Sequence, residues 1–128
     1  MRFLLDSHAF LWWLEGSDHI SEAARSVLRV RENEIFVSLA CVWEMAVKTS
    51  LGKLRLALPF ERFMTENLGR NTFTLFPVEF RHVLGVASLP FHHRDPFDRL
   101  LVAQSIEDEI PVISADTIFD RYGAQRIW

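Results

Sequence analysis

The chain has a single cysteine among its 128 residues, and it lacks any long hydrophobic run. Cys41 cannot form an internal disulfide, and its apolar neighbours predict a buried thiol. No apolar run approaches the roughly 18 residues that a membrane span needs. The first residues, MRFLLDSHAFLWWLEG, carry Asp6 early and show no small-residue cleavage site, so we expect no signal peptide. These absences predict a cytoplasmic protein that does not enter a membrane.

A strong positive charge is also missing. The formal net charge of −3 argues against a protein that holds nucleic acid through a bulk positive field. It does not exclude a nucleic-acid enzyme, because acids gathered in a metal site lower the net charge without marking the binding face. Of the 14 basic residues only Lys48 and Lys53 are lysines, which leaves twelve arginines. This bias fits a phosphate substrate or an acidic partner, and surface solubility explains it equally well.

No repeat, low-complexity tract or linker rich in Pro, Gly or Ser interrupts the chain, so we expect one domain over residues 1–128. Short apolar runs predict strands at 2–5, 34–37, 73–76, 111–114 and 125–127. Helical patterns lie at 7–15, 21–32, 38–50, 59–69, 79–87, 96–108 and 116–121. Pro59 is expected to begin the fourth helix and Gly69 to end it. This alternation predicts an α/β fold with a parallel sheet covered on both faces.

Four acidic residues fall near the ends of these predicted strands. Asp6 directly follows the first strand, and Asp116 lies just past the fourth. Glu44 lies two turns into the helix after the second strand, and Asp98 begins the helix that leads to the fourth. Ligand sites in open α/β sheets lie beyond the carboxyl ends of the strands, so the four carboxylates are predicted to face one edge of the sheet.

Each of these acids also has a simpler interpretation by itself. Asp6 and Asp116 can be helix N-caps, and Glu44 can pair with Lys48 one turn later. Asp98 can be a first-turn acid in a helix capped by Asp95. The coincidence of all four at one edge is what favours a site.

The negative charges of such a cluster of carboxylates repel one another and have to be compensated. Two carboxylates about 4 Å apart repel by about 4 kcal/mol at an effective dielectric constant near 20. Several such pairs would rival the roughly 5–15 kcal/mol that stabilises a whole domain. The cluster therefore persists only if its members are protonated or if a cation lies among them. Oxygen ligands favour Mg²⁺ or Mn²⁺ over zinc, and a divalent ion that retains water suits phosphodiester hydrolysis.

Four stretches of the chain match a known family in its order: LLDSHAFLWWL at the start, SLACVWEMAVKTSLGKL (38–54), HRDPFDRLLVAQS (93–105) and VISADTIFDRYG (112–123). Together they resemble the PIN-domain ribonucleases, and most closely the VapC-type toxins of bacterial toxin–antitoxin systems. The run DPFDRLLVAQ is the most specific. The resemblance implies a PIN-like three-layer α/β/α sandwich around a mostly parallel five-stranded sheet. It also implies an Mg²⁺- or Mn²⁺-dependent endoribonuclease that forms a homodimer, cleaves RNA and is blocked by a small antitoxin wrapped around it.

Residue by residue, the resemblance places the family's acids on Asp6, Glu44, Asp98 and Asp116, which are the four residues chosen above from the strand ends. It implies that Asp6, Asp98 and Asp116 hold the metal directly, with Glu44 a direct or water-mediated ligand. The family often has a hydroxyl residue two positions before its last acid, and Ser114 stands there.

Neighbouring polar residues have less defined roles. Asp95 is expected to cap the following helix and to reach a water on the metal. Arg94 and Arg99 flank the site in sequence and are candidates for phosphate contact, with solvated helix-end charges as the alternative. Asp120 does not stand at a fixed acid position of the family.

Other functions fit the sequence less well. A metal-free ribonuclease would use His8, His92 or His93, but adjacent residues do not share a helix face and histidine is common in a loop before a helix. An aspartate-nucleophile phosphatase needs a second Asp where His8 stands, and a phosphoacceptor domain needs a lysine after the last strand. A catalytically silent binding module has no reason to keep four repelling carboxylates. Trp12 and Trp13 are adjacent, so either one faces a partner or both lie on a wide core face.

Overall fold

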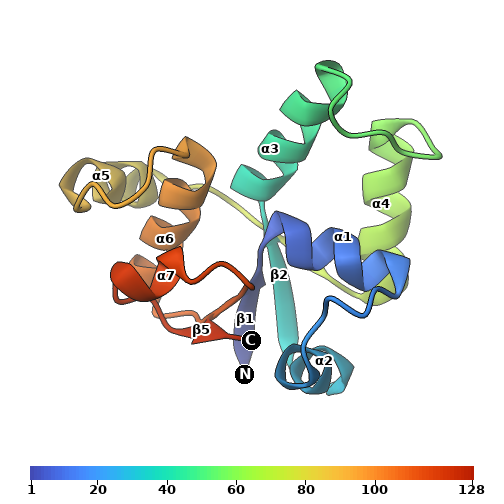
Figure 1. Ribbon diagram of the computed structural model, residues 1–128, viewed down its shortest axis with the longest axis horizontal. Coiled ribbons are helices and arrows are strands. Elements are labelled where there is room, and N and C mark those ends of the chain that lie inside the picture. The colour runs from blue at the N-terminus through green and yellow to red at the C-terminus, as the bar shows by residue number, and fades with distance from the viewer.

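Five parallel strands form one sheet in the order β3-β2-β1-β4-β5 in the computed structural model, which describes all 128 residues (Figure 1). The strands are β1 (Arg2–Leu5), β2 (Glu34–Ser38), β3 (Thr74–Phe76), β4 (Val112–Ile113) and β5 (Arg126–Ile127). The chain builds the sheet outward from β1 to β3 and then returns to add β4 and β5 on the other side of β1. The strand order thus reverses between β1 and β4, the point at which ligands bind in open α/β sheets.

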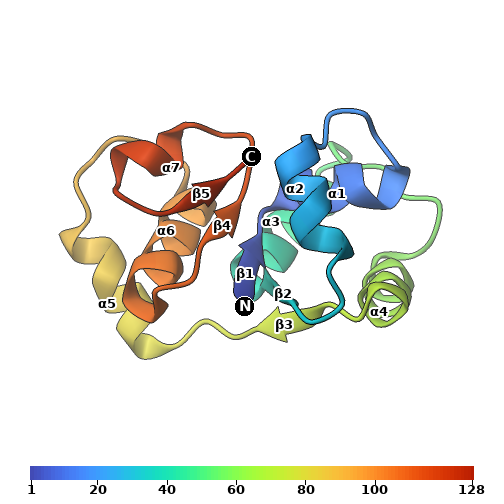
Figure 2. The ribbon, with the colours of Figure 1, turned by 90° about the horizontal axis from the view of Figure 1, so that it is seen from below.

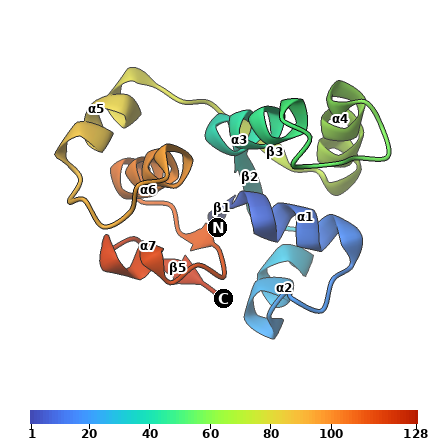
Figure 3. The ribbon, with the colours of Figure 1, turned by 45° about the horizontal axis from the view of Figure 1, so that its top comes forward.

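Helices cover both faces of this sheet. They are α1 (Ser7–Glu15), α2 (Glu22–Arg29), α3 (Leu39–Ser50), α4 (Phe60–Asn71), α5 (Phe80–Ser88), α6 (Pro96–Asp108) and α7 (Ile118–Arg121). Figure 2 shows α1, α2 and α4 on one side of the sheet and α5, α6 and α7 on the other. The α3 helix continues beyond the carboxyl end of β2 and contacts both α1 and α6 (Figure 3). The predicted three-layer α/β/α sandwich is confirmed. None of the helices is long and apolar enough to cross a bilayer.

The central strand explains why the layers pack on both sides. Phe3, Leu4 and Leu5 are consecutive and all buried, as in parallel strands that are covered on both faces. Phe10 of α1 packs into the same core, as does Leu101 of α6. Because this apolar run stops at residue 5, the next side chain, that of Asp6, lies at the carboxyl edge of the sheet.

A buried amide fixes α6 over this edge. Gln104 is fully buried and accepts a hydrogen bond from the hydroxyl of Ser38, the residue that ends β2 and caps α3. Its amide nitrogen donates to the carbonyl of Pro77 at 3.1 Å. The start of α3 and the third turn of α6 are therefore held at fixed positions relative to β2.

Two of the predicted element boundaries are wrong. Gly69 does not end α4, which continues to Asn71 and stops where Thr72 adopts a left-handed conformation with φ of 54°. An exposed glycine costs a helix only about 1 kcal/mol, so the flanking turns carry the helix through it. The helix expected over 21–32 ends at Arg29, because Val30 is extended and the amide of Asn33 donates to the last-turn carbonyl of Val27 at 3.0 Å. The other elements lie within about two residues of their predicted positions.

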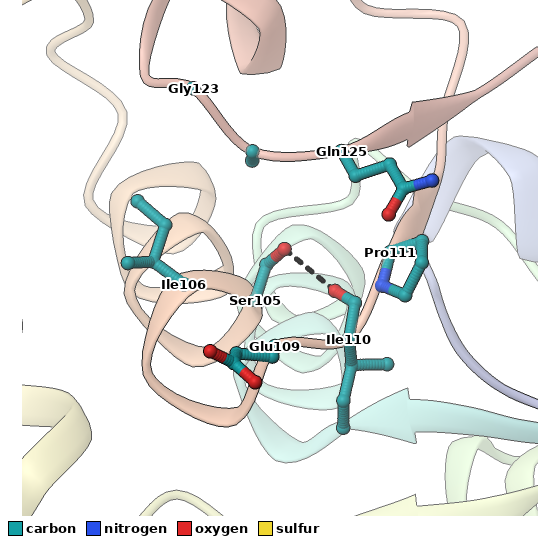
Figure 4. Close-up of a pocket in the computed structure, with 8 residues that line it drawn as sticks. Ser105, Ile106, Glu109, Ile110, Pro111, Gly123 and Gln125 are labelled. Atoms are coloured by element: carbon teal, nitrogen blue, oxygen red, sulfur yellow. Dashed lines mark hydrogen bonds between the residues drawn. The ribbon is translucent and has the colours of Figure 1, made fainter.

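A pocket of about 230 Å³ opens at the opposite, amino end of the sheet, between the end of α6 and the segment that leads into β5 (Figure 4). The hydroxyl of Ser105 is already bonded there to the carbonyl of Ile110 at 2.7 Å. Glu109 is the one charged residue in its lining. The pocket therefore lacks a converging set of reactive groups.

Candidate metal centre

Asp6 occupies the junction between β1 and α1 and is only 7% exposed. One carboxylate oxygen accepts a 2.7 Å hydrogen bond from the backbone N–H of Ala9 and so caps α1. The other oxygen accepts a hydrogen bond from the hydroxyl of Ser114, at the end of β4. Burial raises the pKa of Asp6, and the bonds from Ser114 and Ala9 offset part of this effect. The residue is therefore both a helix cap and an oriented carboxylate at the point where the strand order reverses.

Glu44 approaches from α3 and is 5% exposed. Its two oxygens accept hydrogen bonds from the hydroxyl of Ser7 at 2.7 Å and the ammonium of Lys48 at 2.9 Å. The predicted pair with Lys48 is thus present. The bond to Glu44 raises the pKa of Lys48, and the negative charges of Asp95 and Asp98 raise it further.

Asp98 and Asp116 form the more open part of the cluster. Ligand atoms of Asp98, Asp116 and His93 all lie within 4.8 Å of one another. Burial and the negative charges of Asp95, Glu44 and Asp6 together raise the pKa of Asp98 to about 7. Because Asp98 is influenced by Glu44 and Asp6 and lies against Asp116, the structure gathers all four sequence-predicted acids at one edge of the sheet.

Hydrogen bonds fix the segment that carries Asp116. Its backbone N–H donates to the hydroxyl of Ser114 at 3.0 Å, and its side chain accepts from the N–H of Ile118 at 3.0 Å. Asp116 therefore caps the turn that leads into α7, which explains why this helix begins two residues later than predicted. Ser114 bonds both to Asp6 and to the backbone of Asp116, and so links two of the acids.

The three remaining predicted residues differ in their positions. Asp95 caps α6, accepting from the N–H groups of Phe97 and Asp98 at 2.9 and 3.3 Å. Arg94 is exposed. Arg99 is buried, and its guanidinium donates to the carbonyls of Pro90 and Val86 and to the hydroxyl of Tyr122 at 3.0–3.2 Å. These bonds hold α6 against the segment around α5, so we leave Arg99 out of the proposed phosphate contacts.

His93 is a site residue that sequence reasoning did not favour. Its Nε2 lies 3.1 Å from a carboxylate oxygen of Asp98, and its Nδ1 accepts a 3.4 Å hydrogen bond from the backbone N–H of Asp95. The proton of the neutral ring is therefore on Nε2 and is donated to Asp98. His92 instead packs edge-on against Tyr122. The two histidines are adjacent in sequence, and only the conformation of the loop gives their side chains different neighbours. No pattern in the sequence predicts that conformation.

The donor set fits a hard divalent cation. Carboxylate oxygens supply it, and the Nε2–H of His93 donates to one of them, which suits Mg²⁺ or Mn²⁺. Cys41 is buried as predicted, and burial raises the pKa of its thiol, so it offers no thiolate ligand. Burial, and to a smaller extent the neighbouring acids, raise the pKa values of Asp6 and Asp98, so a cation among these groups would stabilise their ionised forms.

The PIN domain family model matches residues 3–125, and the chain belongs to this family. No curated protein matches it in sequence. VapBC2 from Rickettsia felis, bound to a promoter DNA fragment, is a similar solved structure, with a TM-score of 0.74, 12% identity and 98% and 97% of the two chains covered. DNA-bound VapBC from Salmonella typhimurium has a TM-score of 0.66 and 15% identity, with 98% of this chain and 96% of that chain covered. VapBC-1 from nontypeable Haemophilus influenzae has a TM-score of 0.65 and 12% identity, with 98% of this chain and 96% of that chain covered. At these identities the similarity establishes the shared fold.

Proposed function

We propose that this protein is the toxin of a toxin–antitoxin pair and a metal-dependent endoribonuclease. The observation that carries the proposal is the convergence of Asp6, Glu44, Asp98 and Asp116, from four separate segments, where the strand order of a PIN fold reverses. A domain that only binds would gain nothing from keeping these mutually repelling carboxylates together. A hydrolase gains a cation site from them.

Each acid has a distinct part in this proposal. Asp98 and Asp116, together with Asp6 at the end of β1, would hold Mg²⁺ or Mn²⁺ directly. Glu44 is already paired with the ammonium of Lys48, whereas Asp6 accepts only from neutral donors, so Glu44 suits a ligand that acts through water. When bound, the ion lowers the pKa of a coordinated water and offsets negative charge on the phosphate.

The surrounding residues orient these ligands. Ser114 and the N–H of Ala9 fix both oxygens of Asp6, and the Nε2–H of His93 fixes one oxygen of Asp98. A nearby carboxylate can accept the proton of the attacking water. No step uses the ribose 2′-hydroxyl as nucleophile, so a preference for RNA must come from the way the strand is held.

The proposed partner is a small antitoxin that covers the acids. The similar structures named VapBC support this partner, and the proposal places the pair in the cytoplasm, where cellular RNA is found. A homodimer remains a prediction that sedimentation equilibrium of the purified chain would test.

Cleavage of total bacterial RNA by purified protein, freed of any bound antitoxin, tests the proposal. Reactions contain Mg²⁺, Mn²⁺ or EDTA, and Asp98→Asn is compared with the matched control Asp18→Asn, which removes an exposed acid outside the cluster. We expect discrete fragments that require metal, persist in Asp18→Asn and disappear in Asp98→Asn.

Two other results would contradict the proposal. Cleavage that persists in EDTA and in Asp98→Asn would exclude the metal mechanism and move attention to His93. No cleavage of any RNA, together with no change of melting temperature on adding Mn²⁺, would leave a binding module.

A further inference from the structure

Trp43 is an exposed aromatic side chain beside the acid cluster. It precedes Glu44 on α3, and 53% of its surface is accessible. Its ring packs edge-to-face against Phe97, with centroids 4.7 Å apart and planes at 77°. Phe97 in turn precedes Asp98 on α6. The ring pair therefore bridges the two helices, which lie side by side in Figure 3, next to the acid that each helix contributes.

The neighbouring tryptophans behave differently. Trp13 donates its indole N–H to Asn71 at 3.1 Å, and Trp12 stacks on His19 at 4.9 Å, so both are half-buried on the core side. Their packing against the core fits the alternative of a wide core face, and a partner contact by one of them stays a prediction. Trp43 has no hydrogen bond to its indole N–H, and the contact with Phe97 braces the ring while most of it stays open to solvent.

The position on the helix determines what this ring faces. Adjacent helical residues point about 100° apart, so Glu44 turns inward to Ser7 while Trp43 emerges toward α6 and Phe97. A phosphodiester held at the acids carries a base on each side of the cut. Unpaired bases in single-stranded RNA stack on such aromatic faces. A negatively charged chain also has little bulk positive field with which to hold a strand, so stacking would supply affinity that charge does not.

We propose that Trp43, braced by Phe97, is the stacking subsite for the nucleobase next to the cut phosphate. This inference rests on the proposed function and extends it to how the RNA strand is held. The ligand class is an unpaired base of single-stranded RNA, with the adjoining phosphate at Asp98 and Asp116. Trp43 is a positioning residue in this scheme, since it fixes the strand and takes no part in proton transfer.

Steady-state cleavage of short RNA oligonucleotides, taken from the site that the wild type cuts, tests the subsite. The proteins are the wild type, Trp43→Ala, Trp43→Phe and the control Phe80→Ala, which removes an exposed aromatic from α5. We expect Trp43→Ala to raise KM about tenfold with little change in kcat, from the stacking free energy of one base. Trp43→Phe should recover most of the affinity, and Phe80→Ala should behave as wild type.

Abasic substitutions identify the base. Removing one base beside the cut should raise the KM of the wild type about as much as Trp43→Ala does, and should add nothing in the Trp43→Ala protein. Equal KM values for the wild type and Trp43→Ala would overturn the inference. Additive losses at every abasic position would also overturn it, because they would show an indirect structural effect.

Binding measurements separate this inference from the proposed function. Oligonucleotide binding should quench tryptophan emission in the wild type and quench it much less in Trp43→Phe, whether or not the RNA is cut. Quenching without cleavage by the wild type would refute the nuclease and keep the subsite. Cleavage with unchanged quenching in Trp43→Phe would refute the subsite alone. A loss of dimers in Trp43→Ala with an unchanged KM would assign the ring to a protein interface and overturn the inference.

Discussion

Removing the negative charge of Asp98 should stabilise the metal-free protein. Burial, followed by the charges of Asp95 and Glu44, raises the pKa of this carboxyl to about 7. The gap from an ordinary value near 4 corresponds to about 4 kcal/mol, and solvent screening of the partly exposed group reduces this to about 2 kcal/mol. For a chain of this length, the melting temperature of Asp98→Asn should therefore rise by about 7 °C.

The sign of the pH dependence follows from proton binding. Between about pH 4 and pH 7 the folded protein keeps a proton on Asp98 that the unfolded chain releases, so the free energy of unfolding falls as the pH rises through this window. Above pH 7 the carboxylate is ionised in both states and its full cost is present. Asparagine does not titrate, so the advantage of Asp98→Asn should be small at pH 4 and complete at pH 8.

A divalent cation should reverse this order of stability. At a concentration of Mn²⁺ about 100 times its dissociation constant, the wild type should gain about 2.7 kcal/mol, whereas Asp98→Asn should gain much less. Thermal unfolding followed by circular dichroism, at pH 4, 6 and 8 in EDTA and at pH 8 with Mn²⁺, measures both effects, with Asp18→Asn as the control. An advantage independent of pH, or an equal Mn²⁺ shift in both proteins, would remove Asp98 from the cluster.

Two further substitutions test residues outside the acids. Arg94→Ala should lower by about one the slope of log affinity against log salt concentration for a single-stranded RNA. Arg99→Lys should leave this slope unchanged and lower the melting temperature, because the guanidinium of Arg99 bonds to other parts of the protein. An altered slope in Arg99→Lys would refute this division. Asp108→Ala should cost about 2 kcal/mol in urea unfolding at pH 7, because the buried His82 loses its acceptor. Partial burial raises the pKa of Asp108, but the bonds from Arg81 and His82 lower it more, so the pKa lies below its usual range. The cost of Asp108→Ala should therefore shrink as the pH falls below about 4, because the carboxylate is then protonated. A cost that does not change with pH would contradict this.

The sequence predicts the architecture well because the signals are local. Buried runs such as residues 3–5 mark parallel strands, and the capping chemistry at Asp6 and Asp95 marks where helices begin. The failure at Gly69 shows the limit of such signals. A glycine weakens an exposed helix by only about 1 kcal/mol, which neighbouring turns overcome.

The four acids could be located from the sequence because each has a defined position relative to a strand end. His93 and Trp43 could not, since tertiary contacts determine where their side chains lie. A bond from the N–H of Asp95 turns the ring of His93 toward Asp98. Phe97, 54 residues away along the chain, holds the ring of Trp43. Arg99 is a candidate for the site in the sequence because it is next to Asp98. Its guanidinium instead bonds to Pro90 and Tyr122 and holds α6 in place.

The bond between Ser114 and Asp6 joins residues 108 positions apart. The first of the acids lies at the end of β1, but its partner Ser114 and Asp116 follow more than 100 residues later, after β4. The central strand β1 likewise waits for β4 before its second edge is paired. Folding of β1, β2 and β3 alone therefore brings together only Asp6 and Glu44 of the four acids. The four acids thus come together only once β4 has joined the sheet.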